Sequence, residues 1–253
     1  GNERRKIISE LQEATSSLRT KVVPDSFPEF PGFSISHFHI PFKGIPGGDF
    51  LDYYQLDENN LVVILGDVMG KKWGAWYFAY AYAGYIRSAL RGVLQNTKGY
   101  SPSEILQQVN STVHNDSKIS EVFATLSILI INRENYQLKY SGAGDIPLIY
   151  KKADGEIQRI VSNGLLLGFA KNGEYEDKII NLKPGEKVFL TTDGLIDSRA
   201  RTSESFGEHR LYEIIKNLTD EKDPLKIIHK KFDEFTQGEY DDDISIILIQ
   251  IKN

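Results

Sequence analysis

The order of strand and helix patterns along this chain predicts an α+β sandwich. Strand-like runs joined by short turns come first, then two helical stretches, then more strands, and two late helices precede a final strand. Strands that follow one another through short connections pair antiparallel, and their apolar faces need cover from another layer. A chain of 253 residues is long enough for one large domain with a full core.

Composition narrows the classes of function. Hydrophobic residues are 40% and charged residues 26% of the chain, as in ordinary globular domains. A net charge of −5 argues against nonspecific nucleic-acid binding, which needs a basic surface. The lack of cysteine excludes disulfides and thiolate metal sites and agrees with a cytoplasmic location. The most apolar stretch, residues 73–86, is too short to insert across a membrane, so a buried helix is expected.

The N-terminal 22 residues are expected to form a helix distinct from the main domain, residues 23–253. Its apolar residues recur at spacings of four, three and four, as in a coiled coil: Ile7, Leu11, Ala14 and Leu18. One interpretation is an amphipathic helix lying on its own domain. The other is the end of a signalling helix that pairs with a second subunit to form a homodimer. The chain does not begin with methionine, so we expect a fragment that lacks an upstream sensor domain.

Residues 33–40 read as the first strand, whose alternate side chains face opposite ways. His37 and His39 therefore point the same way, and such a pair can bind a transition metal. Because no third nitrogen or sulfur ligand is evident nearby, both are assigned to packing or to the surface. The turn that follows places Lys43 shortly before Asp49. A cation near backbone N–H groups suits a phosphate, and a solvated lysine is the alternative.

Aspartates recur at the edges of predicted strands. Residues 61–65 read as a buried strand that ends in Gly66-Asp67, and a hairpin pairs it with the strand that Asp49 opens. Asp193 directly follows the strand at residues 187–192, and three aspartates at 241–243 open the final strand. Hard divalent cations need oxygen ligands and negative charge. The pattern therefore predicts that carboxylates converge on Mg²⁺ or Mn²⁺.

Helix signals occupy the intervening segments. The first helix runs to about Leu94 and has a face of small residues, so close packing is expected: Ala75, Ala79, Ala83 and Gly84. Ser101, Pro102 and Glu104 have the spacing of a capping box at the start of the second helix. A late helix is expected to begin at Asp223-Pro224.

Five motifs occur in order: Gly-Gly-Asp-Phe-Leu-Asp at 47–52, Gly-Asp-Val-Met-Gly-Lys at 66–71, Thr-Thr-Asp-Gly-Leu-Ile-Asp at 191–197, Phe-Gly at 206–207 and Asp-Asp-Ile-Ser at 242–245. This set resembles the PPM family of metal-dependent serine/threonine phosphatases, and within it the bacterial SpoIIE/RsbU branch that regulates sporulation and sigma factors. The resemblance implies a four-layer α-β-β-α sandwich, in which two antiparallel sheets face each other and helices lie outside. It also implies hydrolysis of phosphoserine or phosphothreonine on a regulatory phosphoprotein, such as an anti-sigma-factor antagonist.

The resemblance further implies a centre of two divalent cations, Mn²⁺ or Mg²⁺, without a covalent phospho-enzyme. By motif, Asp67 would bridge both ions and the Val68 carbonyl would bind one of them. Asp193 and Asp242 would hold the other ion. Asp49 would orient metal-bound water or complete the second site, so Asp49 and Asp67 are the candidate catalytic residues.

Several positions depart from the family pattern or leave it ambiguous. Lys72 stands in place of a second glycine, Trp76 in place of a small residue, and Asp145 in place of a histidine in a turn that we take as structural. Asp243 adjoins Asp242, and either could be the ligand. The departures motivate an alternative function: a catalytically weak or inactive PPM-fold module that binds a partner. The retained carboxylates argue against it.

Overall fold

Two antiparallel sheets face each other in the computed structural model, which describes residues 2–17, 22–44, 47–70, 75–96, 99, 101–120 and 122–253. The first sheet has the strand order β1 (Phe33–Ile40), β10 (Ile244–Ile251), β9 (Lys187–Thr191), β6 (Leu148–Lys151) and β7 (Ile157–Ile160). The second has the order β2 (Asp49–Gln55), β3 (Asn60–Gly70), β4 (Val122–Asn132), β5 (Gln137–Ala143) and β8 (Lys178–Asn181).

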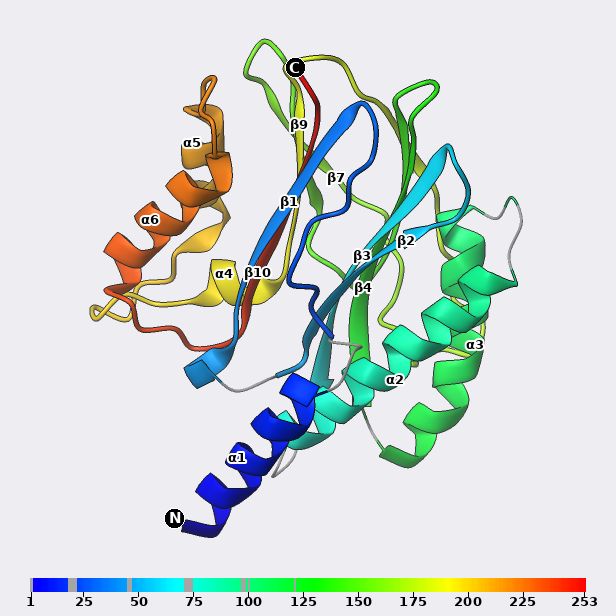
Figure 1. Cartoon of the computed structure of the whole chain (residues 1–253), viewed down its shortest axis with the longest axis vertical. Helices are drawn as coiled ribbons and strands as arrows, with labels where there is room; N and C mark the ends of the chain where they lie inside the picture. Colours follow the sequence, from blue (N-terminus) through cyan, green and yellow to red (C-terminus); the bar gives the residue numbers. More distant parts are fainter. Residues whose placement is uncertain are drawn as a thin grey trace.

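Helices cover the outer face of each sheet. In Figure 1, α5 (Gly207–Lys216) and α6 (Pro224–Thr236) lie outside the first sheet, and α2 (Ala75–Gln95) and α3 (Pro102–Ser120) lie outside the second. The predicted four-layer α-β-β-α sandwich is therefore confirmed.

The core has three layers because the central strands are buried on both faces. Along β3, Val62 and Ile64 face the helices α2 and α3, whereas Val63 and Leu65 face the other sheet. This is the period of two that a strand imposes on its side chains. It explains why residues 61–65 form an unbroken apolar run rather than an alternating one.

The expected strands are present, with one correction and two additions. β3 does not end at Gly66-Asp67 as predicted but continues to Gly70, because β4 pairs with it along its whole length. Gly66 permits this continuation, since a Cβ there would lie 2.3 Å from the ring of Phe50. β7 and β8 were not predicted, because four-residue edge strands carry little periodic signal.

The helix predictions are largely confirmed. Ser101 N donates to Glu104 Oε2 at 3.0 Å and Glu104 N donates to Ser101 Oγ at 3.4 Å, which completes the capping box of α3. Ala79 and Ala83 are buried against the second sheet. The prediction for Gly84 is wrong, because a Cβ there would meet nothing within 4 Å. Lys72, and the side chains of Ala75 and Trp76, lie outside the described part of the structure.

An ion-pair cluster fixes α2 to the second sheet. Asp52 of β2 is only 2% exposed. It accepts two hydrogen bonds from Arg91, at 2.7 and 2.9 Å, and one from Arg87 at 3.3 Å. A buried carboxylate requires such partners, so this cluster sets the position of α2 on the sheet.

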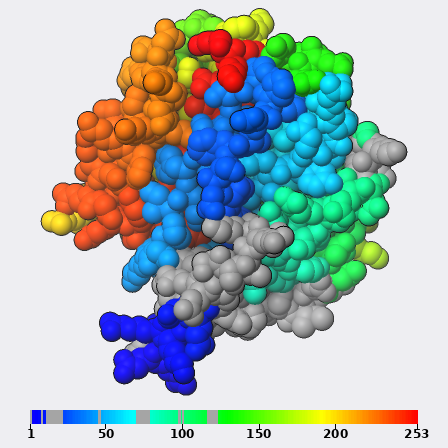
Figure 2. All heavy atoms as spheres, in the orientation of Figure 1, coloured from blue at the N-terminus to red at the C-terminus, as the bar shows by residue number. Residues whose placement is uncertain are grey.

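The N-terminal helix α1 (Asn2–Ser17) lies at one end of the molecule, where Figure 2 shows it in blue. Ile7 of the predicted seam is 44% exposed. Leu18 and the side chains of Leu11 and Ala14 are outside the described part of the chain, so the division at residue 22 and the pairing of this helix stay predictions. Within the described residues, no helix combines the length and apolar character needed to cross a membrane.

Candidate metal centre

Asp49 and Asp67 lie opposite each other on β2 and β3, where they are register partners. Because side chains alternate along a strand, Asp67 shares the face of Val63 and Leu65, and Asp49 shares the face of Leu51. Those three apolar residues pack between the two sheets. Both carboxyl groups therefore point between the sheets, and their residues are 2% and 7% exposed.

The other sheet contributes Asp193 and Asp242. Asp193 is the first residue of the short helix α4 (Asp193–Asp197), which follows β9, and Asp242 precedes β10. β9 and β10 are antiparallel neighbours, so the end of one and the start of the other lie at the same edge. Carboxylate oxygens of Asp67, Asp193 and Asp242 all lie within 4.8 Å of one another. Segments far apart in sequence thus meet at one rim of the sandwich.

Burial and mutual repulsion shift the pKa values of these carboxyl groups upward. Burial raises the pKa of Asp67 to about 11, and the nearby Asp49, Asp193 and Asp242 add to that shift. The pKa of Asp49 is also well above its usual value, first because of burial and then because of Asp243. Burial raises the pKa of Asp242 to about 6. In the absence of cations, this cluster is therefore expected to retain protons at neutral pH.

The donor atoms fit a hard divalent cation. All are oxygens and several carry negative charge, as Mg²⁺, Mn²⁺ and Ca²⁺ require. The Oδ1 atom of Asp193 is buried and has no hydrogen-bond partner among the described residues, which is costly unless something else satisfies it. A Cβ at Gly48 would lie 2.5 Å from the Val68 carbonyl oxygen and 3.1 Å from Asp67 Oδ1. Glycine at this position therefore leaves those two oxygens accessible.

Residues without an assigned role in the sequence hold Asp49 in place. Thr192 Oγ1 and Ser245 Oγ donate to Asp49 Oδ2 at 2.8 and 2.7 Å. His39 Nδ1 lies 2.8 Å from the same Ser245 Oγ. Since the serine hydrogen is used on Asp49, His39 must be the donor in that contact. Thr192 and Ser245 occur within the recognised motifs, but nothing in the sequence indicated that they contact Asp49.

Asp243 contacts the segment that carries Lys43 and leads to Asp49. Asp243 is 2% exposed and its oxygens accept from the backbone N–H groups of Phe42, at 2.8 Å, and Asp49, at 3.2 Å. Asp243 thereby anchors the segment that leads to Asp49. Lys43 is exposed in the 3₁₀ turn Phe42–Gly44, with its Nζ 5.2 Å from the Phe42 ring centroid. Among the described residues, Lys43 forms no hydrogen bond or ion pair with Asp49, Asp67, Asp193 or Asp242.

His37 and Asp145 have structural partners. His37 Nδ1 lies 2.6 Å from the Tyr53 hydroxyl and its Nε2 lies 3.1 Å from the Pro24 carbonyl, in agreement with a packing role. Asp145 Oδ2 accepts from Ser127 Oγ at 2.5 Å and from the Tyr140 hydroxyl. Burial raises the pKa of Asp145 to about 6. These contacts support the interpretation of this turn as structural.

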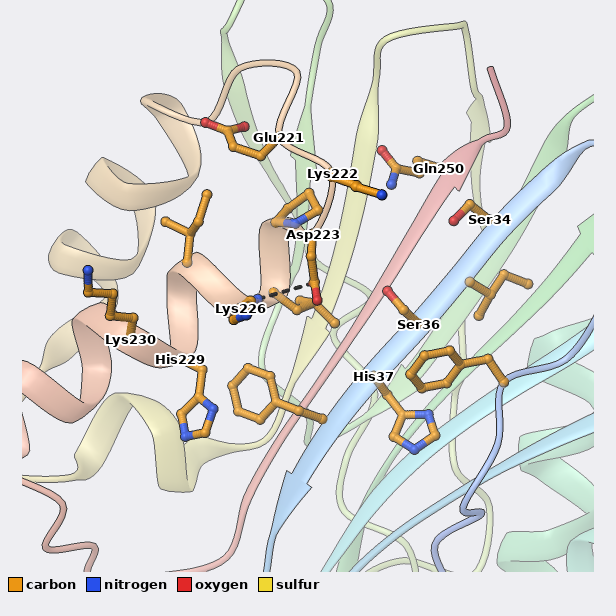
Figure 3. A pocket seen from close by; sticks show the side chains of 16 residues that line it. Ser34, Ser36, His37, Glu221, Lys222, Asp223, Lys226, His229, Lys230 and Gln250 are labelled. Atoms are coloured by element: carbon orange, nitrogen blue, oxygen red, sulfur yellow. Dashed lines mark hydrogen bonds between the residues drawn. The ribbon is translucent and has the colours of Figure 1, made fainter.

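A groove lies away from the aspartates of the candidate metal centre. The groove between β1 and the N-terminal part of α6, shown in Figure 3, has a volume of about 1050 Å³. Ser34, Ser36 and Gln250 line one side, and Lys226 and His229 of α6 line the other. Neither the four aspartates nor Lys43 line it, so it is not part of the candidate metal centre.

Comparisons with known proteins agree with this architecture. The model of the family described as stage II sporulation protein E (SpoIIE) matches residues 57–252. Protein IcfG of Synechocystis is 27% identical over 263 residues, covering 94% of this chain and 41% of IcfG. The phosphoserine phosphatase RsbU of Bacillus subtilis is 24% identical, covering 97% of this chain and 71% of RsbU. This chain thus spans less than half the length of IcfG.

A solved structure shares the fold. The PP2C phosphatase domain of SpoIIE from Bacillus subtilis, solved with a fragment of its regulatory domain, superposes with a TM-score of 0.73 at 18% identity. The alignment covers 87% of this chain and 62% of that one. Two facing antiparallel sheets with outer helices define the PPM phosphatase class of fold. Within that class, this chain belongs to the SpoIIE family, in its SpoIIE/RsbU branch.

Proposed function

We propose that this chain is a protein phosphatase that hydrolyses phosphoserine or phosphothreonine on a regulatory protein and depends on two divalent cations, Mn²⁺ or Mg²⁺. One observation carries the proposal: carboxylate oxygens of Asp67, Asp193 and Asp242, from three separate segments, lie within 4.8 Å of one another. Such crowding of negative charge is unfavourable unless protons or cations neutralise it. Membership of the SpoIIE family supports the same reading.

The residues divide into ligands and supporting groups. Asp67, Asp193, Asp242 and the Val68 carbonyl would hold the cations. Bound cations would stabilise charge on the phosphoryl oxygens and lower the pKa of a water nucleophile. Asp49, the register partner of Asp67 on β2, would complete the second site or orient water.

Two further residues take supporting roles in the proposal. Asp243 is less suited than Asp242 to be a ligand, because its oxygens already accept from the backbone of Phe42 and Asp49. We infer that Asp243 positions Asp49 instead. Lys43 is proposed to contact the substrate phosphate from the exposed turn that Asp243 anchors.

The substrate is proposed to be a switch protein such as an anti-sigma-factor antagonist, by analogy with the named relatives. We propose that phosphatase activity is controlled by an upstream sensor domain and through a homodimer formed by α1. A cytoplasmic location stays a prediction from the sequence.

The test is phosphatase turnover on p-nitrophenyl phosphate and on a phosphoserine peptide, with Mn²⁺, Mg²⁺ or EDTA. Turnover that requires metal and is lost in Asp67→Asn, but is retained in the exposed control Asp220→Asn, would support the proposal. Calorimetric titration with Mn²⁺ on the same samples separates two failures. Metal binding without turnover would indicate an inactive state, and the absence of metal binding would favour the alternative of a partner-binding module.

A further inference from the structure

An apolar surface begins beside the aspartates at the same rim. Met69 follows Asp67 by two residues on β3 and so lies on the same face of the strand. Met69 is 36% and Phe169 is 60% exposed. Phe123 is the register partner of Met69, and its ring centroid lies 6.1 Å from that of Phe169. We call Met69, Phe123 and Phe169 the apolar rim.

A small cavity joins the apolar rim to the candidate metal centre. Its volume is about 250 Å³, and its wall includes both Met69 and Asp193. Its other apolar walls are Leu65, Ile146 and Leu166. Pockets that enclose whole small ligands are larger, on the order of 300–1,000 Å³. The size of this cavity therefore suits one side chain of a larger partner.

The hydroxyl groups of the cavity wall already have partners inside the protein, whereas the unpartnered Oδ1 of Asp193 belongs to the candidate metal centre. Ser127 Oγ donates to Asp145 Oδ2 at 2.5 Å, and Thr192 Oγ1 donates to Asp49 Oδ2 at 2.8 Å. Thr191 Oγ1 donates to the Ser245 carbonyl oxygen at 3.1 Å. Contacts open to an occupant are therefore mainly apolar.

The charge of the cavity wall also favours an apolar side chain over an acidic one in the cavity. Asp145, which lies outside the candidate metal centre, also lines the cavity. A carboxylate brought close to it would lose solvation and meet a like charge. An apolar side chain avoids both costs and gains burial against Leu166 and Ile146.

We propose that this cavity is a specificity pocket for an apolar side chain close to the phosphorylated residue of the substrate protein. The apolar rim then contacts the adjoining apolar surface of that protein, as exposed apolar patches commonly do. The inference depends on the proposed function, in which cations at Asp67, Asp193 and Asp242 hold the phosphorylated residue. That residue brings the neighbouring residues of the substrate to the cavity.

The experiment uses phosphoserine peptides that carry Leu, Ser or Glu at one of the three positions on either side of the phosphoserine. With the whole chain and Mn²⁺, the best Leu peptide is expected to have a kcat/KM about 10-fold or more above its Ser counterpart. The Glu counterpart is expected to be poorer still. Each value is divided by kcat/KM for p-nitrophenyl phosphate, so that general losses of activity cancel.

Variants locate the preference in the structure. Leu166→Glu is expected to abolish the preference for Leu, and Leu166→Ala, which is less disruptive to folding, to reduce it several-fold. Phe169→Ser, which removes an aromatic ring from the apolar rim, is expected to weaken the preference for Leu. The matched control is Ile179→Ser on β8, because Ile179 is 56% exposed and apolar but lies outside the rim and the cavity.

Two results would overturn the inference: equal normalised kcat/KM for Leu, Ser and Glu peptides, or a preference unchanged in both Leu166 variants. If no peptide is hydrolysed, the proposed function fails and peptide binding is measured by fluorescence anisotropy. A preference for Leu in Kd that Leu166→Glu removes would still support the pocket, whereas equal Kd values would refute it.

Discussion

The stability of the metal-free protein is predicted to fall as pH rises from 7.5 to 9.0. Asp67, whose folded-state pKa is raised to about 11, is ionised in the unfolded chain at these pH values. At these pH values the folded protein therefore binds one proton more than the unfolded chain. A carboxyl group whose pKa is raised by folding contributes its full stabilisation of the folded protein below the pKa that it has in the unfolded chain. That contribution is lost as pH rises towards the pKa that it has in the folded protein. For Asp67 this window extends from about pH 4 to about pH 11.

The magnitude follows from proton linkage. One additional proton in the folded state lowers the free energy of unfolding by about 1.4 kcal/mol per pH unit, or about 2 kcal/mol between pH 7.5 and 9.0. Asp49, whose pKa is also well above its usual value because of burial, contributes in the same direction. The range lies above the region where His37 and His39 titrate, because burial lowers the pKa of both.

The assay is urea unfolding in EDTA, extrapolated linearly to water at several pH values. Asp67→Asn removes one proton-binding group, so its loss between pH 7.5 and 9.0 should be smaller than that of the wild type by about 2 kcal/mol or more. Asp220→Asn, an exposed control, should follow the wild type. Added Mn²⁺ should abolish the downward trend, because metal binding displaces the protons.

A wild-type stability in EDTA that does not change over this pH range would refute the reasoning. So would an Asp67→Asn variant with the same slope as the wild type. Either result would mean that the carboxyl groups relax apart or are solvated when no cation is bound.

Two further predictions concern the elements that carry the site. Arg91→Met removes two of the three hydrogen bonds that arginine side chains donate to Asp52, which is 2% exposed. It should lower the free energy of unfolding by about 2 kcal/mol, less than for a fully buried pair because Arg91 is partly exposed. Adding Asp52→Asn should recover part of that loss in thermal melts, and an equally unstable double variant would count against the ion pair. Ser101→Ala removes half of the capping box with Glu104 and should cost about 1 kcal/mol in urea unfolding. Ser111→Ala, at an exposed position within the same helix, should cost much less, and equal losses would mean that the cap contributes little.

The sequence by itself determined the class of fold and most of its elements. An unbroken apolar run at residues 61–65 indicates a strand buried on both faces, because only such a strand has no side open to water. The capping residues Ser101 and Glu104 located a helix start correctly, because the capping interaction is local in the chain. The aspartates could be proposed as one site from their motifs and from their positions at strand edges.

Other features could not be read from the sequence because they depend on contacts between distant segments. Asp67 was expected at the end of its strand, yet pairing with β4 carries β3 past it to Gly70. That continuation places Asp67 on the face between the sheets, where it meets Asp193 and Asp242.

The proposed division of roles between Asp242 and Asp243 likewise rests on tertiary contacts. Adjacent aspartates are equivalent in the sequence, but Asp243 turns inward to the backbone of Phe42 and Asp49, while Asp242 joins the carboxylate cluster. Strand patterns specify which residues share a face. Only the packing of one sheet on the other decides which of those faces meet, and therefore which carboxylates lie close enough to share a cation.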